Sequence, residues 1–437
     1  DELDDEPTDL EPLFRMILDR VPHPVQDNDG PVQFQAATLD HDDFLGRVAI
    51  GRVVRGTIKN GVRYALCQPG REKPPVVPVK GLFRYEGLSR VAADEVKAGD
   101  IAVVAGIEEI TIGDTLCPPE NQEPLPSMKL DEPTISMEFF VSNSPFVGKD
   151  GSLVTSRQIL ARLERAALRD VALVLANADA ADGFEVKGRG VMHLGVLIEN
   201  MRREGYEFCV GKPRVILKEV DGVRCEPYER TVIDVPTEHA GKIIEYLGKR
   251  RAEMTHMEPI RNSTRLEFLV PSRGLIGART ALMTLTQGQA VLSHIFECWR
   301  PDGGLIPART NGVLISDRTG DTVPYALFGL DDRGEWFVPP GVPVYEGMIV
   351  GENNKDNDLW VNVCREKKLT NIRSAGKDEN VRLAPPHVMS LEENLEYIED
   401  DELLEVTPKA LRLRKRILSQ VEAKKYNRKE AKQQQNV

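Results

Sequence analysis

The residues of this chain whose types and spacing could support a chemical function are cations near its C-terminal end, where charge is sorted into blocks. Residues 392–405 hold eight acids, and residues 409–416 hold five basic residues and no acid. Sorted charge of this kind suits a surface that binds a polyanion while the rest of the molecule repels it. The alternative is a solvated face, the usual explanation for a single run of charge. Four further cations precede the acidic block in a segment rich in Asn, Gly and Ser: Lys367, Lys368, Arg373 and Lys377.

The basic block also alternates apolar and basic residues. The sequence Leu411-Arg412-Leu413-Arg414 predicts a strand, because successive side chains of a strand point to opposite faces. With the leucines facing the interior, the two arginines would face outward, where they can contact phosphate. We therefore expect Arg412 and Arg414 to be exposed.

Other residue types that support chemistry lack the spacing that chemistry needs. The histidines are never at metal-ligand spacing, and the six cysteines form no C-x-x-C pair. No G-x-S-x-G sequence marks a nucleophilic serine. Zinc-site and redox-motif functions are therefore excluded, and dispersed thiols suit a reducing cytosol.

A glycine-rich segment, GRGVMHLG at residues 188–195, follows a predicted strand and opens a predicted helix. A dinucleotide fingerprint would place its third glycine at the position of His193, and no parallel-sheet pattern surrounds the segment. We favour a tight strand-to-helix turn. The alternative, an enzyme that binds a dinucleotide, is tested by protection against heat with NAD(P).

Length and composition describe a protein of several domains. The chain has 437 residues, 29% charged and 41% hydrophobic, which is ordinary for globular proteins. No apolar run is long enough to span a bilayer, so no membrane partner is expected. The net charge of −12 argues against indiscriminate coating of nucleic acid, although residues 1–11 alone contribute seven acids.

The elements that must position the charged blocks begin with short alternating strands between residues 32 and 117. The turn at Asn60-Gly61 is a strong hairpin signal. Strand spacing predicts a β-barrel, followed by a proline-rich linker at residues 118–126.

An architectural repeat follows, in which each copy is β-α-β-β-α-β and predicts a four-stranded antiparallel sheet with two helices on one face. The first copy has strands at 135–141, 171–175, 184–187 and 206–210 and helices at 156–168 and 191–203. The second has strands at 231–235, 253–259, 266–270 and 290–298 and helices at 240–249 and 275–285.

Two further helices carry capping-box patterns. Thr8 with Glu11 precedes one, and Ser390 with Glu393 precedes the other, which is predicted to end at Asp400. The helix after Ser390 has a buried stripe of Leu391, Leu395 and Ile398.

Several sequences closely resemble the C-terminal domain of the BipA/TypA translational GTPases: NGVLIS (311–316), YEGMIVGE (345–352), NDLWVN (357–362), KKLTNIR (367–373) and EYIEDDELLEVTPKALRLRKR (396–416). The resemblance extends over nearly the whole chain. It implies a translation-factor β-barrel, two ferredoxin-like domains like the third and fifth domains of elongation factor G, and a mixed α+β family-specific domain. The fold class implied is multidomain α+β.

The family hydrolyses GTP, which requires a G-x-x-x-x-G-K-[ST] phosphate loop. This sequence is absent, and residues 354–357 carry Asn where a guanine-reading motif needs Asp. We therefore expect no GTP hydrolysis by these residues alone, with GTP and magnesium belonging to the full-length family and no cofactor on this chain.

The resemblance implies a ribosome-binding factor in large-subunit assembly and in stress or low-temperature growth, in contact with ribosomal RNA and the transfer RNA acceptor region. We expect a cytoplasmic monomer. An autonomous RNA-binding or scaffold protein is the alternative. For Arg273, at the start of the SRGLIG helix, the alternative is a structural role. The candidate RNA-binding residues are Lys355, Lys367, Lys368, Arg373, Lys377, Arg412, Arg414, Lys415, Arg416 and Arg273.

The predicted domains follow from these elements. Residues 1–25 form the terminal helix of a GTP-binding domain that is otherwise missing, and residues 26–126 form the barrel and linker. The ferredoxin-like domains occupy 127–213 and 214–300, the family-specific domain 301–418, and a flexible basic tail 419–437.

Overall fold

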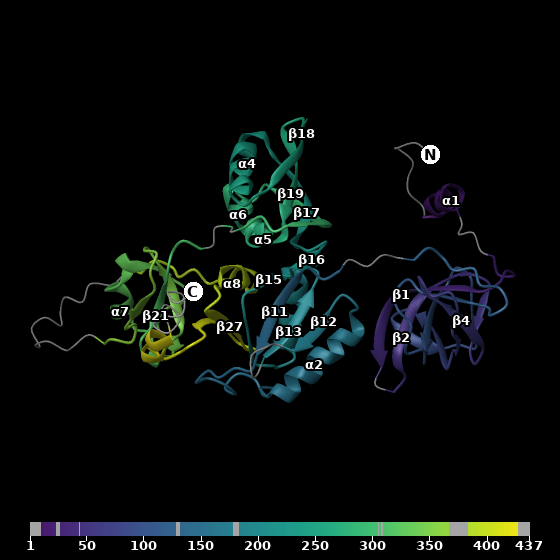
Figure 1. Ribbon diagram of the computed structural model, residues 1–437, viewed down its shortest axis with the longest axis horizontal. Helices are drawn as coiled ribbons and strands as arrows, with labels where there is room; N and C mark the ends of the chain where they lie inside the picture. The colour runs from purple at the N-terminus through teal and green to yellow at the C-terminus, as the bar shows by residue number, and fades with distance from the viewer. Residues whose placement is uncertain are drawn as a thin grey trace, which may run out of the picture. The chain divides into compact units, whose positions relative to one another are not determined.

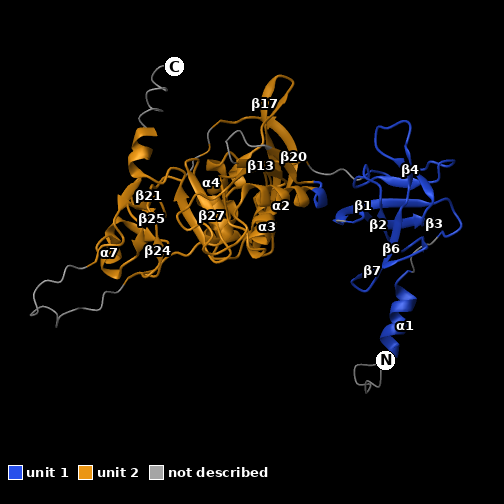
Figure 2. Ribbon diagram, turned by 90° about the horizontal axis from the view of Figure 1, so that it is seen from below, with its two compact units in different colours: residues 1–130, 168–171 blue, residues 131–167, 172–437 orange. Residues whose placement is uncertain are grey.

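The computed structural model describes residues 10–22, 27–42, 44–127, 132–177, 183–304, 306, 309–366 and 383–426. The chain, drawn in Figure 1, divides into two compact units, which are coloured separately in Figure 2. Unit 1 is Asp1–Leu130 with Leu168–Val171, and unit 2 is Asp131–Ala167 with Ala172–Val437. None of the helices in the described ranges combines the length and apolar character needed to cross a membrane.

Unit 1 contains the predicted barrel. Its main sheet has the order β5-β4-β10-β1-β2-β9-β6-β7, and β3 pairs with β8. The barrel core is built from apolar side chains such as Phe34, Leu66 and Leu116, all fully buried. The strands are β1 (Gln33–Asp42), β2 (Gly46–Arg55), β3 (Thr57–Lys59), β4 (Arg63–Cys67), β5 (Val76–Pro78), β6 (Gly81–Glu86), β7 (Ser89–Ala92), β8 (Glu95–Lys97), β9 (Ile101–Ala105) and β10 (Thr115–Cys117).

The hairpin prediction at Asn60-Gly61 is wrong in its pairing. A turn does form there, with Gly61 at φ +75°. However, β3 pairs with β8, and β4 pairs with β10 and β5, so the strands on either side of the turn do not pair with each other. The turn instead moves the chain from one sheet of the barrel to the other.

The proline-rich segment predicted as a linker is held against the barrel. The Gln33 side chain donates to the Glu123 carbonyl at 2.7 Å, and the Leu125 amide donates to the Thr115 hydroxyl at 3.1 Å. Arg55 forms an ion pair with Glu123. These contacts order residues 118–126 although they form neither helix nor strand.

The N-terminal helix α1 (Glu11–Arg20) follows Leu10, whose side chain makes no capping hydrogen bond. The predicted cap, Thr8, lies outside the described residues. The apolar residues of α1 are exposed, including Phe14 and Leu18.

The first module of unit 2 confirms the predicted element order. It runs β11 (Ile135–Phe140), α2 (Ser156–Arg169), β12 (Val174–Asn177), β13 (Gly183–Gly188), α3 (Val191–Arg203) and β14 (Phe208–Val210). Ile159 and Leu163 of α2 and Leu194 and Ile198 of α3, each pair at helical spacing, are buried in the core of the module.

The sheet of this module is longer than predicted. Its order is β12-β13-β11-β14-β27-β28, with β15 (Arg214–Val215) also paired to β11. The added strands β27 (Glu402–Val406) and β28 (Leu411–Lys415) come from the far end of the chain. They join through antiparallel pairing of β14 with β27, in which Cys209 lies opposite Glu405. The four-strand prediction is therefore wrong for this copy, because the last strand acquires a partner remote in sequence.

The second module forms the predicted sheet, in the order β20-β17-β19-β18, with β16 (Lys218–Val220) on β17. Its elements are β17 (Val223–Pro236), α4 (Ala240–Lys249), β18 (Glu253–Ile260), β19 (Ser263–Pro271), α5 (Ser272–Leu275), α6 (Ala278–Leu285) and β20 (Val291–Pro301), with a 3-10 turn η1 (Thr237–His239) before α4. The helix predicted at 275–285 is two helices, because Gly277 at φ +74° interrupts it.

The remaining residues build a small mixed domain beside the first module's sheet. Its sheet has the order β23-β25-β21-β26, and β22 pairs with β24. The capping box at Ser390 and Glu393 is confirmed, and the helix that it starts ends earlier than predicted. The elements are β21 (Val313–Ser316), β22 (Gly320–Asp321), α7 (Pro324–Phe328), η2 (Asp331–Arg333), β23 (Gly334–Trp336), β24 (Pro343–Val344), β25 (Ile349–Asn353), β26 (Leu359–Val361) and α8 (Leu391–Tyr397).

Candidate nucleic-acid interface

Strand β28 exists as predicted, but the prediction that its arginines face outward is wrong. Arg414 is fully buried, and Arg412 is nearly so. Leu413 packs into the core on one face of the strand. The other face is covered by residues 142–151, the loop that follows β11. Alternation therefore identified the strand correctly, whereas burial on both faces depends on a loop far away in sequence.

Arg412 is held by two carboxylates. Its guanidinium lies 3.0 Å from Asp150 and 3.0 Å from Glu405, which is 1% exposed. The hydroxyl of Tyr345 also donates to Glu405. Burial disfavours ionisation of Asp150, but hydrogen bonds from Arg412 and Thr407 outweigh it and hold the pKa of Asp150 below its ordinary value. The Arg412 charge is neutralised inside the protein.

Arg414 is satisfied by acceptors of the chain itself. It donates to the Asn143 side-chain oxygen at 2.6 Å and to the Lys415 carbonyl at 3.1 Å. A buried guanidinium needs such partners, because an unpaired buried charge is strongly destabilising.

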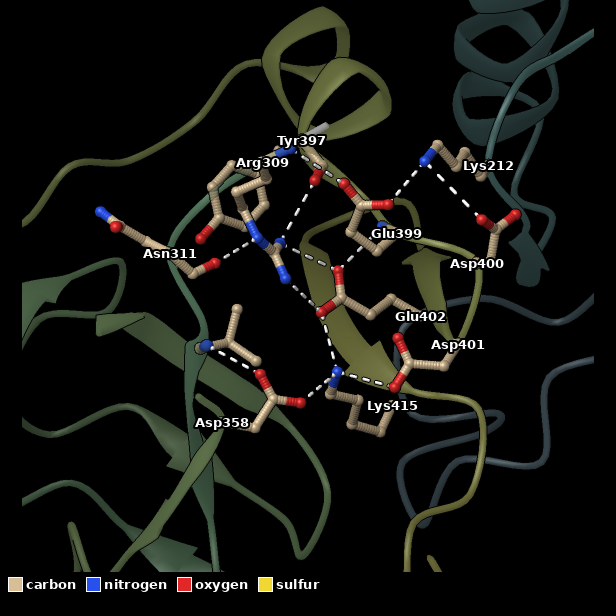
Figure 3. A network of polar contacts seen from close by, with 11 residues as sticks. Lys212, Arg309, Asn311, Asp358, Tyr397, Glu399, Asp400, Asp401, Glu402 and Lys415 are labelled. Atoms are coloured by element: carbon tan, nitrogen blue, oxygen red, sulfur yellow. Dashed lines mark hydrogen bonds and ion pairs between the residues drawn. The ribbon is translucent and has the colours of Figure 1, made fainter. Parts of the chain in front are cut away.

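Lys415 belongs to a buried cluster that Figure 3 shows at close range. Its ammonium lies 3.0 Å from Glu402, 2.9 Å from Asp401 and 2.6 Å from Asp358. Burial alone would lower the pKa of Lys415, but the charges of Glu402 and Asp401 raise it above the ordinary lysine value. The charge of Lys415 is therefore also neutralised within unit 2.

Glu402 is the centre of that cluster, with a side chain that is 0% exposed. Arg309 contacts the same carboxylate oxygen of Glu402 as Lys415 does, at 2.8 Å, and stacks on the ring of Tyr397 at 4.4 Å. Burial favours the neutral acid, but the hydrogen bonds of Arg309 and the charges of Lys415 and Arg309 outweigh it, so the pKa of Glu402 lies below its ordinary value. Basic and acidic residues therefore balance each other here inside the protein, and do not form the solvated face considered from the sequence.

Arg273 occupies a comparable structural position. It forms two hydrogen bonds with Glu226, whose side chain is 0% exposed, and lies 3.1 Å from Asp302. The α5 helix thereby attaches to β17 and to the segment after β20. Its geometry fits the structural role named as the alternative.

Two predicted cations remain accessible among the described residues. Lys355 is exposed on the loop after β25. Arg416 is 40% exposed, 3.5 Å from Glu138 and stacked on Phe140 at 4.8 Å. Lys367, Lys368, Arg373 and Lys377 lie outside the described residues.

A cation that sequence reasoning missed lies beside Lys355. Arg333 ends the short helix η2, and it lines a cavity of about 410 Å³ together with Lys355. The sequence Asp331-Asp332-Arg333 reads as a mixed-charge turn, so no local signal marked it. Its proximity to Lys355 is a property of the fold alone.

A second cavity of about 300 Å³ has the opposite character. Its lining includes Glu335, Glu352, Glu393 and Glu396 and neither lysine nor arginine. Burial raises the pKa of Glu396 above its ordinary value, against the hydrogen bond from Thr280. Phosphate is repelled from this face.

The glycine-rich turn at residues 188–195 joins β13 to α3 within an antiparallel sheet. The Arg189 amide donates to the His193 ring at 3.3 Å, inside the turn itself. A dinucleotide fingerprint needs a parallel strand-helix-strand unit. The turn therefore serves the fold, as favoured from the sequence.

Comparison with known proteins identifies three segments by family. Residues 311–420 match the TypA/BipA C-terminal domain, residues 223–307 the elongation factor G C-terminus, and residues 46–117 elongation factor Tu domain 2. These matches agree with the multidomain α+β fold described above.

Curated relatives match over nearly the full chain. A protein of Bacillus subtilis named large ribosomal subunit assembly factor BipA is 49% identical over 95% of this chain and 68% of its own length. Proteins of the same name from Salmonella typhimurium and Synechocystis are each 46% identical, over 96% and 94% of this chain and 69% of their own lengths. At this identity and coverage, the chain belongs to the BipA/TypA family of translational GTPases.

Proposed function

We propose that this chain acts in assembly of the large ribosomal subunit, in the cytoplasm and as a monomer, by binding ribosomal RNA. The observation that carries the proposal is the 46–49% identity, over nearly the whole chain, to proteins named for that role. We further infer from the family resemblance a contact with the transfer RNA acceptor region and a part in stress or low-temperature growth. GTP and magnesium would serve the full-length protein.

The distribution of paired and unpaired cations supports a specific docking face. Arg412, Arg414 and Lys415 are neutralised within unit 2, whereas Lys355 and Arg333 have no ion-pair partner among the described residues. A chain with net charge −12 is repelled by RNA in bulk. Binding would therefore depend on a few placed cations, with Arg416 and the predicted cations of residues 367–377 as further candidates.

Sedimentation with ribosomal particles tests this proposal. The protein is mixed with large-subunit precursors, mature large subunits or small subunits across a range of salt concentrations. We expect it to pellet with large-subunit particles, and each phosphate contact to contribute roughly 0.7–0.9 to the slope of log affinity against log salt. Equal binding to small subunits, or none to either, would contradict the proposal.

A double variant, Arg333→Ser with Lys355→Ser, should weaken pelleting and flatten the slope by roughly 1.4–1.8, because two contacts are lost. Lys242→Ser, which removes an exposed charge from α4, is the control and should leave the slope unchanged. Both proteins should melt as the parent does, since these side chains are exposed. An unchanged slope in the double variant would remove this face from the interface.

A further inference from the structure

The cavity beside Lys355 is built by two segments that are joined by hydrogen bonds. The helix η2 supplies Asp332 and Arg333, the end of β25 supplies Asn353, and the loop after β25 supplies Asn354, Lys355 and Asn357. The Asn354 amide donates to the Arg333 carbonyl at 2.8 Å, and the Gly312 amide donates to the Lys355 carbonyl at 2.8 Å. The walls are therefore preformed. The lining residues are Asp332, Arg333, Asn353, Asn354, Lys355, Asn357 and Leu359.

The two cations of the cavity are available to an anion. Neither Arg333 nor Lys355 takes part in an ion pair with any described residue, although other cations of the same domain are paired twice or more. Two unpaired cations that line one concavity attract an anionic group such as phosphate. Asp332 lines the same cavity, so a bare anion would meet repulsion as well as attraction.

The remaining polar groups of the cavity can accept hydrogen bonds. The side-chain nitrogen of Asn353 donates to the Asn357 carbonyl at 2.6 Å, and that of Asn354 donates to the Asp332 carbonyl at 3.2 Å. Among the described residues, no group donates to the side-chain oxygens of these asparagines or to the Asp332 carboxylate. Asn353 is only 3% exposed, so its orientation is held by packing.

A ribonucleotide carries groups that both sets of residues can bind. Its phosphate suits the cations, and its ribose hydroxyls or base amino groups suit the acceptors, as when an acidic residue accepts from a 2′-hydroxyl in dinucleotide sites. The volume of about 410 Å³ lies within the usual range for small-molecule sites. A base in a duplex has its pairing edge occupied, whereas an unpaired base presents it.

We propose that this cavity binds one unpaired ribonucleotide of the RNA, with its phosphate on Arg333 and Lys355 and its hydroxyl or amino donors on Asp332 and the asparagines. The inference rests on the proposed RNA-binding function and deepens it. It implies that the protein distinguishes RNA from DNA, because the 2′-hydroxyl is the group that differs between them.

Fluorescence anisotropy with three labelled probes of one sequence tests the inference: single-stranded RNA, single-stranded DNA and duplex RNA. We expect single-stranded RNA to bind about tenfold more tightly than either of the others, the effect of one well-formed hydrogen bond to a charged group. Asp332→Ala should reduce the affinity for single-stranded RNA to within about twofold of the affinity for single-stranded DNA. Arg333→Ser with Lys355→Ser should weaken the binding of RNA and the binding of DNA to the same extent.

Controls keep the outcomes separate. Lys242→Ser should match the parent, and each variant should keep the parent's melting temperature. Equal binding of RNA and DNA by the parent, or a preference for duplex RNA, would overturn the ribonucleotide site. If the parent nevertheless pellets with large-subunit particles, the proposed function stands. If it pellets with none, the function fails whatever the oligonucleotides do.

Competition distinguishes a nucleotide within an RNA chain from a free nucleotide. Unlabelled large-subunit RNA and transfer RNA should each displace the labelled RNA. In the Asp332→Ala variant, the protein's preference for either RNA competitor over DNA should be reduced. Displacement by free 5′-AMP as effective as by the polymers would overturn an RNA site in favour of a free-nucleotide site.

Discussion

Replacing Glu402 with glutamine should destabilise unit 2 strongly. The substitution keeps the shape of the side chain but leaves Arg309 and Lys415 without the carboxylate that contacts both, at 2.8 and 3.0 Å. Breaking a buried pair by removing one partner costs about 3–5 kcal/mol. Lys415 retains Asp358 and Asp401, so we expect the lower end, about 3 kcal/mol.

Tryptophan fluorescence is a suitable assay, because all three tryptophans of the chain, at positions 299, 336 and 360, lie in unit 2. For a unit of about 300 residues, about 3 kcal/mol corresponds to a fall of roughly 5 °C in the melting temperature. Asp401→Asn is the matched control. Asp401 contacts the same Lys415 ammonium, but its side chain is 68% exposed, so its loss should cost less than about 1 kcal/mol.

The pH dependence of the same unit gives an independent check. The native pKa of Glu402 lies below the ordinary value of 4.5, so its contribution is present above that value and is lost as pH falls through the native pKa. Glu402→Gln should therefore lose stability at neutral pH and be less sensitive to acid than the parent. A variant that melts like the parent at neutral pH would refute the argument that this carboxylate compensates two buried cations.

The other predictions concern single side chains. Arg414→Ser should lower stability by about 3–5 kcal/mol, because it removes a fully buried guanidinium and leaves its acceptors unpaired, while the salt slope of ribosome pelleting stays unchanged; a flatter slope with normal melting would contradict its buried position. Glu396→Gln should stabilise the protein at neutral pH and not in acid. The native pKa of Glu396 is raised, so the folded protein loses stability as pH rises and this carboxyl ionises, whereas glutamine stays neutral and still accepts from Thr280. Denaturant titration at two pH values measures the difference. Ser390→Ala should cost about 0.5–2 kcal/mol through loss of the α8 cap, read from the same fluorescence transition.

Local patterns in the sequence were sufficient for most elements. Period-two alternation identified β28, and the Ser390 capping box identified the start of α8. These signals depend on residues within a few positions of one another. The break at Gly277 was missed, because a glycine inside a helical pattern does not by itself reveal a left-handed conformation.

The candidate site was predicted less well, since exposure is not a local property. Alternation shows that Leu413 and Arg414 point to opposite faces of a strand, but it does not show whether the second face meets water. The tertiary structure decided that question by adding β27 and β28 to the first module's sheet and by covering the arginine face with residues 142–151. It also placed Arg333 beside Lys355.

The sequence by itself determined the repeated β-α-β-β-α-β order, the barrel and the sorting of charge into blocks, because these follow from neighbouring residue types. Only the tertiary structure decided which of the charged side chains are neutralised by partners within the protein. Arg414 and Lys415 are buried, and Arg412 is nearly buried, against acceptors drawn from segments far apart in the chain, whereas Lys355 is exposed. The physical reason is that a buried cation is stable only with a partner close to it in space, and distance in space is not encoded by distance along the chain.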